Sequence, residues 1–336
     1  MKVLGIESSC DETAAAVVED GRKIISNIVR TQISTHELYG GVVPEIASRA
    51  HLEAISSVTR LALEPIGGIE NIDAISVTNA PGLIGALLVG VGFAKGLSFS
   101  SSKPLVPVHH IRGHVAAAYL THYDLTPPFI ALIVSGGHSH LVYVSDYTSY
   151  KILGGTRDDA AGESFDKAAR VLGLGYPGGP KMDALAKLGD PDSIYFPRVH
   201  FHDAPFDFSF SGVKTSIINY VHNAEQTGKE LNKPDVAASF SKAICEILTE
   251  KAVFAVNYFN LPQKKLVVAG GVAANSMLRK MISEEADKNG ITLYIPDIPL
   301  CGDNGAMIAS QGYYEYCSGN IASSDLNAFA TESIEL

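Results

Sequence analysis

Two stretches of the 336-residue sequence decide its fold: KVLGIESSCDETAAAVV at 2–18 and FIALIVSGGHSHLVYVSD at 129–146. Each stretch begins with an apolar run of strand length, passes through a short turn of small and polar residues, and returns as a second apolar run. This pattern is typical of a β-hairpin. Because the same pattern opens both halves of the chain, it predicts a duplicated domain. The alternative is two unrelated tight turns of similar composition.

Alternating strand and helix patterns follow each hairpin. Strand-like apolar runs are found at 72–78 and 104–108 in the first half and at 265–269 and 292–295 in the second. Such alternation is typical of α/β domains. We therefore expect two α/β lobes, an N-terminal lobe at 1–125 and a C-terminal lobe at 126–336.

The composition indicates a soluble protein of a reducing compartment. Lys and Arg total 26 against 36 for Asp and Glu, and the net charge of −10 argues against a protein that coats nucleic acid by charge alone. A polyanionic substrate would need a local basic face or a partner subunit. The four cysteines are scattered without a CxxC pair, which disfavours a disulfide framework and a cysteine zinc site. The apolar run at the N-terminus is too short for a signal-peptide core, so we expect a cytoplasmic location.

One segment has the composition of a membrane span. Residues 80–97, APGLIGALLVGVGFAKGL, are strongly apolar, but they are marginal in length, contain five glycines and include Lys95. We expect a buried helix that packs closely on a sheet, and no membrane association.

Glycine-rich turns indicate a ligand with phosphate groups. The backbone N–H groups of two such hairpin turns can approach an anion without obstruction by Cβ atoms. A third glycine-rich element, LVVAGGVAAN at 266–275, reads as a strand, a glycine turn and a helix that begins near Asn275. Since it is not a GxGxxG motif, a dinucleotide fold is not favoured. We predict a nucleotide-like ligand in a cleft between the lobes.

A pair of histidines indicates a metal site. His110 and His114 are four residues apart in a helical pattern, which places both on one helix face. Two imidazoles at this spacing suit zinc or ferrous iron, and Asp303 in a glycine-flanked turn is the candidate third ligand. Two alternatives stay open: a pair of surface histidines, and a role of Asp303 as the N-cap of the following helix. We expect His109 to lie on another side of the helix, as a packing or supporting residue.

The histidine pair does not indicate a peptidase. A metalloprotease of the HExxH kind needs a glutamate directly after the first histidine as general base. Here the stretch is HIRGH at 110–114, without a glutamate.

Nine strings, in order between Val3 and Gln311, resemble the universal tRNA threonylcarbamoyltransferase family: GIESSCDETAAAV, GGVVPEIASRAH, VHHIRGH, VSGGHS, DDAAGESFDKAAR, YPGGP, FSFSGVKT, AGGVAAN and CGDNGAMIA. The resemblance implies an actin-like, sugar-kinase-like fold with two duplicated lobes around a nucleotide cleft. It implies transfer of a threonylcarbamoyl group from threonylcarbamoyl-AMP to N6 of adenosine 37, just 3′ of the anticodon. The acceptor tRNAs would be those that read ANN codons.

The resemblance also implies partners. The working complex would contain the subunits TsaB and TsaE, and TsaC would supply the adenylate. The helix at 82–97 is a candidate docking surface for a homologous lobe; purely internal packing is the alternative. The competing function is an ATP-dependent small-molecule phosphotransferase of the same fold. Paired histidines favour the transferase, because sugar kinases coordinate Mg²⁺ through carboxylates and phosphates.

Carried over position by position, the resemblance makes His110, His114 and Asp303 the ligands of one Fe²⁺ or Zn²⁺ per chain. The residues expected to contact the adenylate are Val134, Ser135, Gly136, Gly137, His138, Asp166, Gly179, Asp183 and Asn275. Asp166 is otherwise a surface helix acid, and Asp183, expected at a helix start, would otherwise favour that helix N-terminus. Asp11 and Glu12 are candidates for the base that takes the proton of the acceptor amine; their alternative role is to bind water or cap backbone groups.

Overall fold

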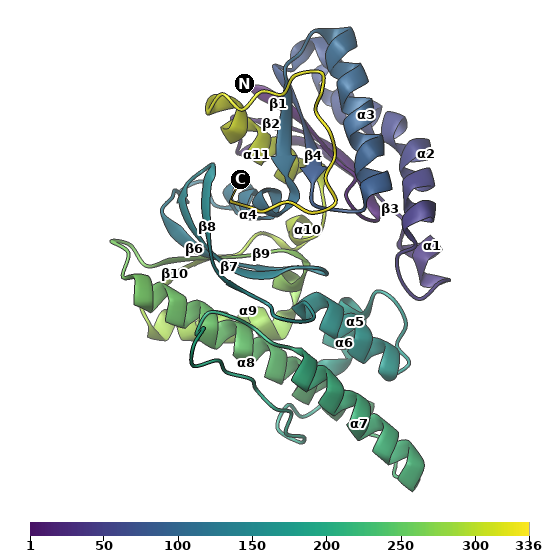
Figure 1. The fold of residues 1–336 in the computed structure, drawn as a ribbon, viewed down its shortest axis with the longest axis vertical. Helices are drawn as coiled ribbons and strands as arrows, with labels where there is room; N and C mark the ends of the chain where they lie inside the picture. Colours follow the sequence, from purple (N-terminus) through teal and green to yellow (C-terminus); the bar gives the residue numbers. More distant parts are fainter. Residues whose placement is uncertain (336) are drawn as a thin grey trace. The chain divides into compact units, whose positions relative to one another are not determined.

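The computed structural model describes residues 1–335, and its chain divides into two compact units (Figure 1). Unit 1 contains Met1–Pro127, Val144–Lys151 and Ile295–Leu336, and unit 2 contains Pro128–Tyr143 and Ile152–Tyr294. The first division lies close to the expected one after residue 125. The assignment of all of 126–336 to a second lobe is wrong, because the C-terminal segment belongs to unit 1.

A five-stranded sheet forms the centre of unit 1. Its order is β3-β2-β1-β4-β5, and β2 runs antiparallel to β1 and β3, whereas β4 is parallel to β1 and β5. The strands are β1 (Lys2–Glu7), β2 (Glu12–Glu19), β3 (Lys23–Thr31), β4 (Ala74–Ala80) and β5 (Leu105–His109). The helices are α1 (Ile33–Glu37), α2 (Pro44–Leu63), α3 (Ile84–Ser101), α4 (His110–Thr121), α10 (Ile298–Cys301) and α11 (Gly305–Cys317). Two 3₁₀ turns, η1 (Glu64–Ile66) and η2 (Ile69–Asn71), follow α2.

The unit 1 sheet is buried on both faces. Successive residues of a strand point to opposite faces, so Leu4 and Ile6 join one apolar cluster with α2 and α3, and Val3 joins another with α4 and α11. The predicted hairpin at 2–18 is confirmed, since β1 and β2 pair from Lys2↔Glu19 to Glu7↔Ala14.

Close contact between glycines and backbone explains why the C-terminal segment belongs to unit 1. A Cβ at Gly5 would lie 2.3 Å from the nitrogen of Ala309, and one at Gly312 would lie 2.3 Å from Cβ of Ser76. Helix α11 therefore lies directly on β1 and β4, at a separation that only glycine allows. The sequence gives no signal for which sheet this helix covers.

The sheet of unit 2 repeats the topology of the first. Its order is β10-β9-β6-β7-β8, in which β9 is parallel to β6 and β10. Its strands are β6 (Phe129–Val134), β7 (Ser139–Asp146), β8 (Ser149–Gly155), β9 (Lys265–Ala269) and β10 (Thr292–Tyr294). Its helical elements are α5 (Ala161–Val171), α6 (Gly178–Ala186), α7 (Ser211–Thr227), α8 (Lys233–Phe259), η3 (Gly271–Ala274) and α9 (Ser276–Lys288). Both sheets thus have the order third, second, first, fourth, fifth strand, as a duplicated domain requires.

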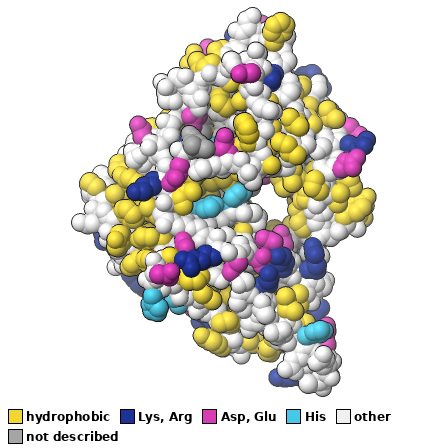
Figure 2. Space-filling model, viewed as in Figure 1, with side chains coloured by type: hydrophobic (Ala, Val, Ile, Leu, Met, Phe, Trp, Pro, Cys, Tyr) yellow, Lys and Arg dark blue, Asp and Glu magenta, His cyan; other side chains and the backbone are white. Residues whose placement is uncertain are grey.

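Helix α3 is less buried than expected. Leu87 and Val91 pack inward, but Leu88 is 49% exposed and Phe99 is 90% exposed. Figure 2 shows hydrophobic side chains gathered on the surface over α2 and α3. Within residues 1–335, α3 is the one helix long and apolar enough to cross a membrane, and one such helix is weak evidence for a span.

Candidate functional site

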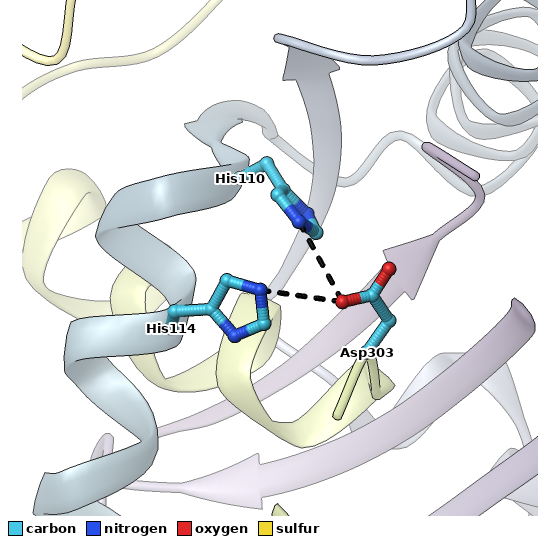
Figure 3. Close-up of side chains that lie close together, drawn as sticks. All are labelled: His110, His114 and Asp303. Atoms are coloured by element: carbon cyan, nitrogen blue, oxygen red, sulfur yellow. Dashed lines mark ion pairs between the residues drawn. The ribbon is translucent and has the colours of Figure 1, made fainter. Parts of the chain in front are cut away.

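Three side chains of unit 1 converge as a candidate metal site (Figure 3). Asp303 Oδ1 lies 3.2 Å from His114 Nε2 and 3.6 Å from His110 Nε2. The two imidazole rings stand edge to face, with centroids 4.6 Å apart. The expectation that both histidines lie on one helix face is confirmed, and Asp303 points toward them.

Local sequence signals place these side chains. Strand β5 ends at His109, which is the N-cap of α4: its Nδ1 accepts a hydrogen bond from the Ile111 N–H. His109 is therefore a capping residue and does not lie on the helix surface. Asp303 lies between α10 and α11, and the neighbouring Asn304 caps α11 by accepting from the Met307 N–H. The alternative role of Asp303 as this N-cap is thus wrong.

The donor atoms fit a first-row divalent metal ion. Ligands that surround a tetrahedral ion at about 2.0–2.1 Å lie about 3.3 Å from one another, close to the two separations from Asp303. His114 is 1% exposed, and within residues 1–335 its Nδ1 has no hydrogen-bond partner. Two imidazoles and one carboxylate leave room for a further ligand, which is the composition of catalytic sites.

Glu7, which the sequence analysis did not single out, supports His110. Its carboxylate is fully buried; Oε2 lies 3.1 Å from His110 Nδ1 and accepts from the Thr78 hydroxyl at 2.6 Å. Its Oε1 accepts from the Ser9 N–H. A carboxylate at Nδ1 places the proton there and leaves the Nε2 lone pair for a metal. The only sequence signal for Glu7 is its place at the end of the first strand.

Negative charge favours a cation at this site. Burial acts to lower the pKa of His110, but the charges of Asp303 and Glu7 outweigh it and raise that pKa to about 9. Burial acts to raise the pKa of Glu7, and the charge of His110 and its hydrogen bond outweigh it, so the pKa of Glu7 is lowered. Without metal, His110 therefore carries a second proton, on Nε2, in addition to the one on Nδ1. A metal ion must displace the Nε2 proton in order to bind.

We expect Glu7→Gln to weaken metal binding about 10-fold, because supporting carboxylates typically contribute 10–100-fold to affinity. The amide keeps the shape and one acceptor but removes the charge. The measurement is a Co²⁺ titration followed by visible absorption. Glu19→Gln, whose carboxylate pairs with Lys23 near the surface, serves as the control, and equal affinities of the two variants would contradict the role of Glu7.

Asp11 and Glu12 lie at the turn that leads into β2. Asp11 is buried, and its backbone carbonyl accepts from the Gln32 N–H. Glu12 accepts a 3.2 Å hydrogen bond from the Thr31 hydroxyl. Burial, the charge of Asp303 and the charge of Asp11 raise the pKa of Glu12 to about 9. Glu12 is thus a carboxyl group whose proton affinity depends on the charge at the candidate metal site.

In unit 2, the predicted glycine turns meet at one edge of the sheet. Strands β6 and β9 are parallel and end side by side, at Val134 and Ala269. Gly270, at φ +93°, lies so close that an added Cβ would meet the Val134 carbonyl at 2.4 Å. In contrast, a Cβ at Gly136, Gly137 or Gly271 would meet nothing within 4 Å. The carboxyl ends of parallel strands are the usual ligand site of open α/β sheets.

Two of the remaining residues expected at the adenylate, Asp166 and Asp183, bind the chain neighbours of two others, Gly179 and Asn275. Asp166 Oδ1 accepts a 2.7 Å bond from the N–H of Gly178, directly before Gly179. Asp183 is the sixth residue of α6, so its expected place at a helix start is wrong. Asp183 instead accepts from the N–H and the hydroxyl of Ser276, the first residue of α9.

Asn275 has a structural contact of its own. It caps α9 by accepting from the Leu278 N–H, which confirms the predicted helix start. The side-chain oxygen of Asn275, Oδ1, therefore accepts a hydrogen bond within the protein. The carboxylate of Asp183 also forms an ion pair with Lys187 at 2.8 Å. These contacts fix the orientation of both side chains.

Comparisons with known proteins identify the family of this chain. The family model described as TsaD, tRNA N6-adenosine threonylcarbamoyltransferase, matches residues 23–310. A tRNA N6-adenosine threonylcarbamoyltransferase of Clostridium botulinum is 53% identical over 329 residues, which cover 98% of this chain and 96% of that protein. The protein of the same name from Clostridium perfringens is 54% identical over 327 residues, or 97% and 96% of the two chains.

Solved structures support the fold. The crystal structure of T. kodakarensis HypF matches 97% of this chain and 49% of its own at a TM-score of 0.64 and 16% identity. Component A of the Acidaminococcus fermentans (R)-2-hydroxyglutaryl-CoA dehydratase matches 94% of this chain and 99% of its own, at a TM-score of 0.54 and 15% sequence identity. The expected actin-like, sugar-kinase-like fold is confirmed.

Proposed function

Because this chain belongs to the tRNA N6-adenosine threonylcarbamoyltransferase family, we propose that it transfers threonylcarbamoyl from threonylcarbamoyl-AMP to N6 of adenosine 37 in tRNAs that read ANN codons. The family membership makes it a transferase that acts on tRNA. One observation carries the finer proposal: buried His110 and His114 converge with half-buried Asp303 in a chain that matches this family along almost its full length. A phosphotransferase of the same fold would have no need of paired imidazoles.

His110, His114 and Asp303 are the proposed ligands of one Fe²⁺ or Zn²⁺ per chain. These three side chains would hold the ion, which would supply Lewis-acid chemistry toward the carbamoyl or phosphate oxygens of the mixed anhydride. Glu7 keeps the His110 proton on Nδ1 and so holds its Nε2 ready for coordination. The choice between iron and zinc is left to elemental analysis, since both accept two imidazoles and a carboxylate.

Asp11 and Glu12 are the proposed proton acceptors for the N6 amine. The amine must lose a proton as the new bond to the carbamoyl carbon forms, and adenylate leaves as the anhydride bond breaks. The raised pKa of Glu12 reflects burial and the neighbouring charges of Asp303 and Asp11. A cation at the ligand cluster would offset that negative charge, lower the pKa and provide the carboxylate form that a base needs.

Unit 2 supplies the proposed binding residues for the adenylate. Its phosphate would lie against the turn formed by Val134, Ser135, Gly136, Gly137 and His138. The proposed contacts to the ribose and base are Asp166, Gly179, Asp183 and Asn275. The open space beside Gly136, Gly137 and Gly271 supports this proposal, because a ligand can approach the backbone there.

We expect Gly137→Val to weaken AMP binding at least 10-fold without changing the folded structure. The valine side chain would enter space that no protein atom occupies within 4 Å of its Cβ, so it obstructs a ligand and not the fold. Calorimetric titration with AMP, together with thermal unfolding of the free protein, measures both effects. An unchanged AMP affinity would remove the turn from the proposed site.

The reaction is tested by reconstitution. Purified chain, threonylcarbamoyl-AMP, TsaB, TsaE and tRNA should yield the modified nucleoside, with TsaC plus its substrates able to replace the adenylate. Leaving out one component at a time identifies what the chain needs. Rapid ATP-dependent phosphorylation of a small molecule, with no modified tRNA, would instead favour the phosphotransferase.

The α2–α3 surface is the proposed docking site for TsaB, defined by exposed Leu52, Leu61, Ile84 and Leu88. Gly92 and Gly96 of α3 also have open space beside them, which allows a second helix to approach closely. The acidic net charge of −10 supports a role for partners in holding tRNA. A cytoplasmic location follows from the proposal, since this chain would meet its tRNA there.

We expect Leu88→Glu to weaken TsaB binding at least 100-fold, because a charge at the centre of an apolar interface stays without a partner. The matched control is Leu188→Glu, which changes an equally apolar residue, 78% exposed, in unit 2. Binding is measured by surface plasmon resonance. Equal loss in both variants would argue against docking on α3.

A further inference from the structure

The C-terminal strap, residues 321–335, lies along unit 1 as a chain of backbone contacts (Figure 1). Its main-chain groups contact β5, the Lys95 side chain of α3, β4 and the turn between β4 and α3. The contacts are Ala322 N–H to Leu105 carbonyl at 2.8 Å, Lys95 Nζ to Leu326 carbonyl at 3.0 Å, Phe329 N–H to Asn79 carbonyl at 2.9 Å, and Gly82 N–H to Ala330 carbonyl at 3.2 Å. No motif of the sequence marks this tail.

The strap ends on the first turn of α4, at the residues that flank His110. His109 Nδ1 accepts from the Ile111 N–H, so its Nε2 carries the proton and donates to the Glu332 carbonyl at 3.3 Å. Arg112 donates from Nε and Nη2 to the Ile334 carbonyl at 3.0 and 2.8 Å. Two carbonyl groups of the strap thus hold α4 on both sides of a proposed metal ligand.

Arg112 is the centre of this contact. Its guanidinium is buried, lies 4.9 Å from the centre of the Tyr150 ring, and donates from Nη1 to Glu315 Oε1 at 3.0 Å. Because the guanidinium is planar and is held by these contacts, the Arg112 side chain has little freedom to rotate. The Ile334 side chain is also buried, at 4% exposed, so apolar packing and the two hydrogen bonds hold the same residue.

We infer that the C-terminal strap is a positioning element of the metal centre, and that Arg112 is the positioning residue through which it acts. The inference rests on the proposed metal site. With His109 and Arg112 fixed, the first turn of α4 cannot rotate about the helix axis. His110 and His114 then keep the mutual geometry that an ion at about 2.0–2.1 Å from each ligand requires. A tail that only covers apolar surface would have no such effect.

The test compares two variants. The first ends after Ala330 and lacks both carbonyl contacts; the second, Ile334→Ala, keeps the backbone and loses only apolar packing. Co²⁺ titration of each folded protein should show at least 10-fold weaker binding by the truncated chain and wild-type affinity in Ile334→Ala. Thermal unfolding of the metal-free proteins measures stability separately. Equal affinity of the truncated and full-length chains, or equal loss in both variants, would overturn the inference.

A second measurement on the unaltered chain serves if the truncated protein does not fold. If the strap favours metal binding, metal must favour the ordered strap to the same degree. Amide hydrogen exchange of residues 328–335 should therefore slow at least 10-fold when Co²⁺ is added, while 321–326 should change little. Exchange that is independent of Co²⁺ would overturn the inference. Failure of the full-length chain to bind any metal would instead contradict the proposed metal site itself.

Discussion

The double substitution His110→Ala, His114→Ala should reduce bound iron or zinc from about one ion per chain to none, because one carboxylate cannot hold a transition metal alone. Threonylcarbamoyl transfer should fall at least 100-fold, since Lewis-acid stabilisation is worth several kcal/mol. Elemental analysis measures the first effect and the reconstituted tRNA assay measures the second.

The matched control for this experiment is the pair His200→Ala, His202→Ala. Both of these histidines are exposed in unit 2. Their substitution therefore also removes two imidazoles from the protein, but it leaves His110, His114 and Asp303 unchanged. The control should keep its metal and its activity. A doubly substituted protein at 110 and 114 that retained full metal content would remove the site on which the mechanism depends.

Glu315→Ala should lower the free energy of unfolding by about 3–5 kcal/mol, because it leaves a buried charge without its partner. Glu315 is 3% exposed and accepts from Arg112 Nη1, from the Gln311 amide and from the Asn320 amide. Without the carboxylate, the guanidinium of Arg112 keeps the Ile334 carbonyl and the ring of Tyr150 as its partners among residues 1–335. Urea unfolding followed by circular dichroism gives the measurement.

The comparison variant is Glu45→Ala, which breaks the Arg49–Glu45 pair at 2.8 Å on the surface of α2. The two side chains are 74% and 78% exposed, so water solvates each charge whether or not the pair forms. No measurable change in stability is expected. A similar loss in both variants would show that burial is not what makes the Arg112–Glu315 pair matter.

Local patterns predicted most strands of both sheets, although not β3 and β8. The run at 265–269 is β9, those at 104–108 and 292–295 are each within one residue of β5 and β10, and that at 72–78 overlaps β4, because apolar runs of this length must be buried in a sheet. The similar hairpins led to the prediction of a duplicated domain, and the equal strand orders of the two sheets confirm it. The predicted buried helix at 80–97 packs on the sheet through Leu87 and Val91, but its other face is exposed, since apolar composition does not distinguish a packed face from an exposed one.

The metal cluster was accessible from the sequence only in part. His110 and His114 are four residues apart, which places them on one helix face. This is a local property that can be recognised without knowledge of the fold. Asp303 lies 189 residues after His114, and its spacing could not decide between a ligand and an N-cap. The place of Glu7 at a strand end did not reveal its role, because its partner His110 follows another strand of the same sheet.

The sequence by itself determined the two hairpins, the four strands that follow them, the duplication, the two imidazoles on one helix face and the membership of a family. These follow from periodicity and from motifs within a few residues of one another. The tertiary structure alone decided that α11 and the strap return to unit 1, that Asp303 faces the histidines and that Arg112 holds the tail. Those contacts depend on glycine-permitted approach of backbones and on carbonyl groups, which every residue has and which no side-chain pattern can therefore reveal.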